Sequence, residues 1–154
     1  MTTVTAARMT AEEWRTANSR YLAAEMQRLR LLLNRRILWL RKHWRREAAQ
    51  NYLSWAISDQ EADILLAGSD HQEELGFYES DPAAQSIAGS LVEVSRQLSA
   101  QREEMQAAGT SSPLDTLAAR FELTPFERDV VLLCLAPELD PAFERLYEIG
   151  RAHV

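Results

Sequence analysis

The first 67 residues contain neither glycine nor proline, and no other feature of the sequence limits the possible folds as strongly. Glycine and proline are the residues that most often interrupt a helix, so one helix is predicted from about residue 11 to 52. Its apolar side chains recur at steps of three and four, on one stripe of a helix: Leu22, Met26, Leu29, Leu33, Ile37, Leu40 and Trp44. Leu31, Leu38 and Trp39 lie off this stripe, so the middle of the helix is expected to contact neighbours on more than one side.

The starts of further helices are marked by capping residues. Thr10–Glu13 and Ser58–Glu61 have the capping-box pattern, a hydroxyl residue followed three positions later by glutamate. A capping residue followed by proline, which suits the first helical position, occurs at Asp81-Pro82, Ser112-Pro113, Thr124-Pro125 and Asp140-Pro141. Gly68 and Gly109 stand where helices are expected to stop.

These signals predict helices over residues 59–67, 82–108, 113–121, 125–136 and 141–147, and they leave 69–80 unassigned. The helix over 82–108 has its own apolar stripe of Ile87, Leu91, Val94 and Leu98, and we expect it to pair with the first helix as a coiled-coil hairpin. No segment alternates with the two-residue period of a strand. The predicted fold class is all-α, with a helical region over 11–108 and the start of a winged-helix-like domain over 113–147.

Charge is distributed unevenly along the chain, whose net charge is −6. Residues 28–46 hold eight basic side chains and no acid, whereas 47–95 hold ten acids and no Lys or Arg. A basic helix can bind nucleic acid or an anionic membrane. On a helical wheel, however, these cations surround most of the non-apolar circumference. We therefore expect them to face the acidic segment 47–81 or a protein partner.

The residue types needed for catalysis or cofactor binding are missing or isolated. A phosphate-binding loop requires glycines and a lysine, and the only lysine, Lys42, lies in the glycine-free segment. His43, His71 and His153 stand apart from one another, and Cys134 is expected to be a small core residue in an apolar run. No catalytic, cofactor-binding or metal-binding residue is assigned. The longest apolar run is far shorter than the about 20 residues of a membrane span, and a cytoplasmic location is expected.

Residues 114–136 have the pattern of a helix-turn-helix. A DNA-binding second helix would expose basic side chains, but here only Arg128 is basic, and Glu127 and Asp129 flank it. The apolar second half of this helix is expected to be buried. A helix-turn-helix DNA-binding regulator with a coiled-coil arm stays open as the alternative function.

Residues 117–147, LAARFELTPFERDVVLLCLAPELDPAFERLY, closely resemble part of a family of bacterial AAA+ ATPases. Residues 14–22 (WRTANSRYL) and 57–63 (ISDQEAD) are similar to the same family. In that family a helical and winged-helix region precedes the ATPase module, and some members are encoded with contractile injection systems. Their Walker A loop, Walker B acid and arginine finger have no counterpart in this sequence.

The resemblance implies a non-catalytic N-terminal adaptor or regulatory region. ATP and Mg²⁺ would bind only in a missing module, and the parent protein could form a ring. The expected partners are other proteins or the parent's own ATPase module, not nucleic acid. Residues 148–154 (EIGRAHV) resemble a translated sequencing adapter, so the natural frame is expected to be cut near Tyr147. A winged-helix domain cut there would leave part of the apolar surface of 125–136 uncovered.

Overall fold

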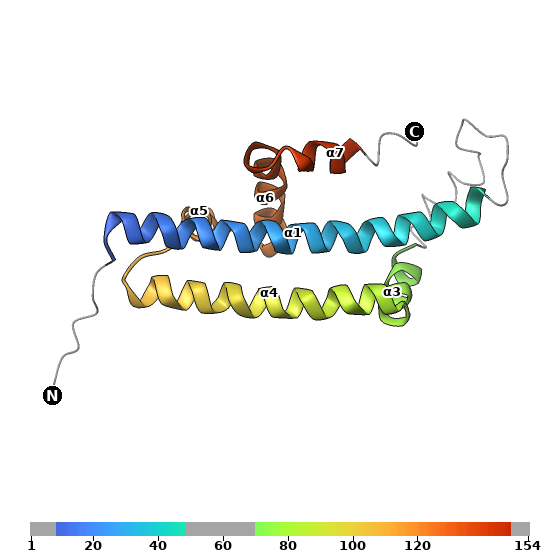
Figure 1. Ribbon diagram of the computed structural model, residues 1–154, viewed down its shortest axis with the longest axis horizontal. Coiled ribbons are helices and arrows are strands. Elements are labelled where there is room, and N and C mark those ends of the chain that lie inside the picture. The colour runs from blue at the N-terminus through green and yellow to red at the C-terminus, as the bar shows by residue number, and fades with distance from the viewer. Residues whose placement is uncertain (1–8, 49–69, 149–154) are drawn as a thin grey trace. The chain divides into compact units, whose positions relative to one another are not determined.

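The structure is a computed structural model that describes residues 9–48 and 70–148. Side chains are described for 9–42 and 71–147. The regular elements in these ranges are helices (Figure 1): α1 (Ala11–Ala48), α3 (Asp70–Ser80), α4 (Pro82–Ala107), α5 (Pro113–Arg120), α6 (Pro125–Leu139) and α7 (Ala142–Glu148). The predicted all-α class is confirmed. The predicted helix over 59–67, its cap Ser58 and the stop at Gly68 lie outside the described residues.

The predicted caps form where the described residues include them. The backbone N–H of Glu13 donates to Thr10 Oγ1 at 3.2 Å, and that of Thr10 donates to Glu13 Oε2 at 2.7 Å. Thr124 and Glu127 make the same reciprocal pair at the start of α6. Each satisfies N–H groups that a helix end leaves free. The side chains of Asp81, Ser112 and Asp140 likewise accept hydrogen bonds from the backbone of the helices they precede.

Two helices differ from the prediction. Residues 70–80, which were left unassigned, form α3 because Phe77 packs against Trp39, with ring centroids 5.6 Å apart. The helix predicted to end at 136 continues through Pro137 to Leu139. A proline this close to a helix end disturbs few hydrogen bonds, and the N–H of Asp140 still donates to the Ala136 carbonyl at 2.9 Å.

The described residues form two compact units. The first comprises those through Arg30 together with Val92–Phe143. Here α1 and α4 run antiparallel, since Trp14 Nε1 donates to the Ser111 carbonyl at 3.2 Å and Arg20 pairs with Glu104 at 3.3 Å. The pairing of the two helices is thereby confirmed in this unit, while coiled-coil packing stays a prediction. The core of the unit is formed by Ala17, Tyr21, Ala24, Met26, Leu29, Val94, Leu98, Met105, Leu114, Leu132, Ala136 and Phe143.

The second unit comprises the described residues of Leu31–Leu91 and those from Glu144 onward. Its core cluster joins Trp39, Phe77 and Ala84. The ammonium of Lys42 lies 4.5 Å from the centre of the Phe77 ring, a distance that permits a cation–π contact. The burial of Trp39 confirms that α1 contacts neighbours away from its apolar stripe.

Two helices of the first unit end in a residue with left-handed backbone conformation. Gly109 ends α4 with a φ of 71°, and the N–H of Thr110 donates to the Met105 carbonyl at 2.9 Å. Glu122 ends α5 with a φ of 52°, and the N–H of Leu123 donates to the Ala118 carbonyl at 2.9 Å. Both ends have the hydrogen bond of a Schellman cap. Only glycine adopts this conformation without strain, so Glu122 is held in a strained backbone.

Substitutions at these two ends should have opposite effects on stability. Gly109→Ala should lower the free energy of unfolding by about 1 kcal/mol, because a Cβ is disfavoured at positive φ. Glu122→Gly should raise it by about 0.5 kcal/mol, because it removes the same strain but adds chain entropy. Urea unfolding followed by far-UV circular dichroism measures both. A destabilised Glu122→Gly variant would show that the glutamate side chain matters more than the backbone strain.

Candidate functional site

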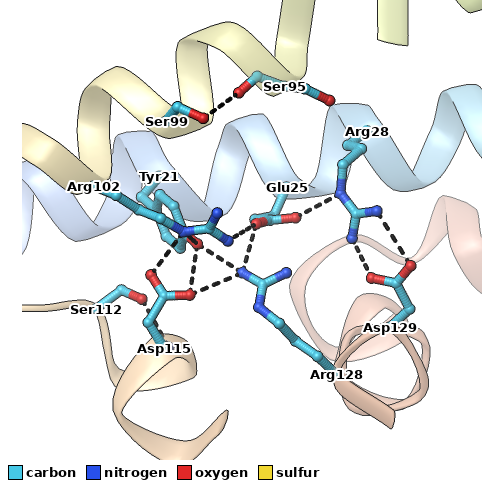
Figure 2. A network of polar contacts seen from close by, with 10 residues as sticks. All are labelled: Tyr21, Glu25, Arg28, Ser95, Ser99, Arg102, Ser112, Asp115, Arg128 and Asp129. Carbon is cyan, nitrogen blue, oxygen red and sulfur yellow. Dashed lines mark hydrogen bonds and ion pairs between the residues drawn. The ribbon is translucent and has the colours of Figure 1, made fainter. Parts of the chain in front are cut away.

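Helices α5 and α6 form a helix-turn-helix unit, joined by residues 121–124. Leu114 of α5 and Leu132 of α6 are buried and belong to the core of the first unit. The unit also contacts α1 through polar side chains, and these contacts form the most extensive network of charged groups in the described residues (Figure 2).

Glu25 lies at the centre of this network. Its side chain is fully buried on α1, where an unpaired carboxylate would be strongly destabilising. Three guanidinium groups surround it: Arg128 Nη2 donates to Oε1 at 2.6 Å, Arg28 Nε donates to Oε2 at 2.9 Å, and Arg102 Nη2 lies 3.5 Å from Oε1. The negative charge is therefore buried but paired.

Tyr21, one turn before Glu25, extends the network to α5. Its hydroxyl accepts hydrogen bonds from Arg128 Nη2 at 2.6 Å and from Arg102 Nε at 2.9 Å, and it donates to Asp115 Oδ1 at 2.9 Å. Asp115 in turn accepts from Arg102 Nε through its second oxygen at 3.2 Å. Its own backbone N–H is capped by Ser112 Oγ at 3.0 Å.

Arg28, one turn after Glu25, extends the network to α6. Its Nη1 donates to Asp129 Oδ2 at 3.2 Å, and its Nη2 donates to Asp129 Oδ1, so the guanidinium holds the carboxylate through two atoms. Two-point contacts of this kind fix orientation as well as distance. The network thus joins one turn of α6 and the first turn of α5 to three successive turns of α1.

The network alters the acidity of its members. Burial would raise the pKa of Glu25, but the hydrogen bonds from Arg128 and Arg28 outweigh it, and the net pKa is lowered. The pKa of Asp115 is lowered in the same way, by Tyr21 and Arg102 against burial. Burial raises the pKa of Tyr21, which therefore keeps its proton as a hydrogen-bond donor. Every carboxylate of the network is paired with at least one arginine.

The basic segment 28–46 is largely paired within the chain in the part whose side chains are described. Arg28 bonds Glu25 and Asp129, and Arg30 pairs with Asp140. In the second unit, Arg36 pairs with Glu74, an acid of the segment 47–81. Also in that unit, the Arg35 guanidinium lies 4.4 Å from the centre of the Tyr78 ring. Arg28, Arg30 and Arg36 are thus paired within the chain, but only Arg36 meets an acid of 47–81 as predicted, and a protein partner for this segment stays a prediction.

One exposed stripe of α6 is apolar. Phe126, Val130 and Cys134 are exposed and follow one another at steps of four, so they share one face of the helix. Phe126 is 76% exposed. Leu117 of α5 and Phe121, which follows that helix, are exposed as well. Part of the apolar surface of 125–136 is thus uncovered, as expected from the sequence.

Two predictions about α6 are wrong. Cys134 is exposed rather than in the core, and the apolar second half of the helix is buried on one side only. The buried side passes through Leu132 and Ala136, one turn apart. Cys134 lies two positions from each of them, or about 200° around the helix. The hydrophobic character of the residues did not reveal which side faces the core.

The sequence patterns did not predict the charged network. Tyr21, Glu25 and Arg28 have the spacing of a polar stripe beside the apolar one, and this was the available signal. Their partners on α4, α5 and α6, however, lie between 77 and 107 residues later in the chain. The lysine and histidines that were examined for catalysis or cofactor binding do not belong to this network where they are described. Lys42 belongs to the second unit and His71 is exposed. The side chains of His43 and His153 lie outside the described range.

Within residues 9–48 and 70–148, no three or more His, Cys, Asp or Glu side chains are placed to hold a metal ion. The helices of these ranges also lack the length and apolar character needed to cross a membrane.

The fold and the network define a helix-turn-helix module attached to a pair of antiparallel helices. A family model, the winged helix domain, variant, matches residues 13–153, and the chain belongs to this family. The described residues contain the helical part of such a domain. Comparisons with curated proteins and with solved structures gave no match.

Removal of the central charge should destabilise the protein. Glu25→Gln removes the central carboxylate of Arg28, Arg102 and Arg128, each of which keeps one further carboxylate partner, and we expect a loss of about 3 kcal/mol in the free energy of unfolding. Glu93→Gln is the matched control, because it breaks an exposed pair with Arg96 in the same unit and should leave the free energy of unfolding nearly unchanged. Urea unfolding at pH 7 measures both. Equal small losses would show that Glu25 is not electrostatically coupled to the arginines.

Acid should weaken the network. Glu25 and Asp115 have lowered pKa values in the folded protein. Their stabilising contribution is complete above the ordinary carboxyl pKa of about 4 and is lost as the pH falls through the lower folded values. The free energy of unfolding should therefore stay level from pH 7 to about 5 and decline below about 4. The gap between wild type and Glu25→Gln should narrow over that decline. A loss already complete at pH 5 would contradict this assignment.

Proposed function

We propose that this chain is a non-catalytic adaptor region of a AAA+ ATPase and that it contacts the ATPase module through the exposed side of α5 and α6. The resemblance of residues 14–22, 57–63 and 117–147 to the N-terminal region of such ATPases supports the parent class. Membership of the winged-helix family agrees with that region's composition. The proposal places catalysis, ATP and Mg²⁺ in the ATPase module and the protein in the cytoplasm.

The observation that carries the contact role is the apolar face of the helix-turn-helix unit. Large exposed apolar side chains in one area are typical of protein–protein contact sites. Phe121 and Phe126 are 67% and 76% exposed, and aromatic residues are enriched at such interfaces. The network around Glu25 fixes the helices that present this face, so the surface is formed before a partner binds.

No observation favours the alternative of a DNA-binding regulator. The only basic residue of α6 is Arg128, and its guanidinium bonds Glu25, Tyr21 and Asp115 instead of facing solvent. The exposed positions of α6 include Glu127 and Glu138, which would repel phosphates.

The first test reads the source DNA beyond the codon for Tyr147. A frame that continues through a β-hairpin to a Walker A motif supports the AAA+ parent. A natural stop codon directly after the codon for Val154 would contradict the proposal and favour a self-contained helical binding protein.

The second test measures binding of this chain to the purified AAA+ module from the same locus, by isothermal titration calorimetry. Phe126→Asp should weaken binding at least tenfold, because it places a charge in an apolar contact that then must be desolvated. Val92→Asp is the matched control: Val92 is 70% exposed, lies on α4 in the same unit and should leave affinity unchanged. Wild-type affinity in the Phe126→Asp variant would refute the proposed contact face.

A further inference from the structure

The apolar stripe of α6, formed by Phe126, Val130 and Cys134, has the shape of a contact with another helix. Its members follow one another at steps of four, so they form a ridge about 12 Å long and one side chain wide. Ridges of this spacing pack into the grooves between the equivalent ridges of a partner helix. A ridge this narrow matches a helix better than the broad face of a sheet.

The charged residues next to this stripe are acidic. Glu127 lies about 100° around α6 from Phe126, and Glu138 lies about 120° from it, so both border the stripe on the side of Cys134. We call these two glutamates the acidic edge. Both are exposed, and neither is paired with a cation among the described residues. The cap of α6 uses only Oε2 of Glu127, so the charge of the edge stays available to a partner.

The arginines near α6 do not balance the acidic edge. Arg128, the only basic residue of α6, points toward Glu25 and Tyr21 in the charged network (Figure 2). Arg120, in the last turn of α5, is exposed and is paired with neither glutamate of the edge. In water the two carboxylates are solvated and need no partner. They nevertheless favour one kind of partner, because opposite charges at the rim of a contact attract and like charges repel.

A second copy of this chain fits the surface poorly. In an antiparallel pair of α6 helices each edge lies against the same edge of the other copy, so Glu127 and Glu138 would face their own equivalents. In a parallel pair the acidic edge would face the side of Asp129, whose carboxylate Arg28 already balances. Neither arrangement offers an unpaired cation of α6 to the edge. The charge pattern therefore favours a different protein segment.

We propose that the stripe of α6 binds an amphipathic helix of a partner protein whose apolar residues cover the stripe and whose lysines or arginines face the acidic edge. The inference rests on the proposed function for the identity of the partner, the ATPase module, and on the stripe and its edge for the chemistry. Glu127 and Glu138 are eleven positions apart, or about 16 Å along α6. Partner cations about three turns apart on one side of a helix would reach both.

The test uses two synthetic peptides of about 18 residues, long enough to form a helix. They share one stripe of leucines and carry either lysines or glutamates along its edge. Binding to the full chain under reducing conditions is followed by ¹H–¹⁵N NMR of the Val130 and Cys134 amides. In about 0.1 M NaCl the lysine peptide should bind about tenfold more tightly than the glutamate peptide, and the difference should vanish in 1 M NaCl, where charges are screened beyond about 3 Å.

Three results would overturn the proposal. The first is equal affinity of the two peptides at low salt, and the second is no binding of the lysine peptide. The third is reversible dimerisation of the chain that shifts the Val130 and Cys134 amides before any peptide is added, since it would assign the stripe to a second copy.

A pair of charge reversals locates the attraction at the acidic edge. Glu138→Lys should weaken binding of the lysine peptide about fivefold and strengthen binding of the glutamate peptide, because an exposed charge at a rim has a modest effect. Glu103→Lys is the matched control, since it makes the same change at an exposed position of α4 in the same unit and should leave both affinities within about twofold. Circular dichroism checks that both variants keep the fold. Equal weakening in both variants would contradict recognition by the acidic edge.

The same variants separate this inference from the proposed function when they are titrated with the purified AAA+ module. Binding of the module that Phe126→Asp weakens and Glu138→Lys leaves unchanged would keep the contact face and refute the basic helix. Selective binding of the lysine peptide by a chain that does not bind the module would refute the ATPase module as the partner and support the chemistry assigned to the stripe.

Discussion

A carboxylate shut away from water needs positive charge close to it, and Glu25 meets this requirement with three arginines from three different helices. Arg28 comes from α1 itself, Arg102 from α4 and Arg128 from α6. Because the geometry of each contact is narrow, α4 and α6 can approach α1 in few arrangements. Replacing a buried ionic group by apolar side chains of similar size is often neutral or even stabilising. The value of this network therefore lies in the specific arrangement that it imposes on the first unit.

Local patterns in the sequence were sufficient for most of the helix starts in the described residues and for the end of α4. The capping residues Thr10, Ser112 and Thr124 and the stop at Gly109 act through neighbours within five residues, so they are visible in a short window. Helix α3 was missed because its formation depends on Phe77 packing against Trp39, a contact between distant segments. Tertiary packing of this kind often determines whether a segment without clear periodicity forms a helix.

The network was not predictable for a related reason. A glutamate between apolar positions on a helix is ordinarily solvated, and only the pairing of α1 with α4 and α6 brings its cations near. Cys134 shows the reverse case, since an apolar run suggested burial and the helix turned that position outward. In both cases the sequence showed the type of residue at each position. Whether that residue faced the core or the solvent depended on how the helices pack.

The outward position of Cys134 has a chemical consequence, because a solvent-accessible thiol can react with oxidants and with other thiols. It is the single cysteine of the chain, so any disulfide it forms joins two molecules. Such a covalent dimer would press the apolar sides of two α6 helices together and hide the surface that carries Phe126 and Val130. Under air oxidation such a dimer would cover this exposed apolar surface, and a reducing environment would leave it uncovered.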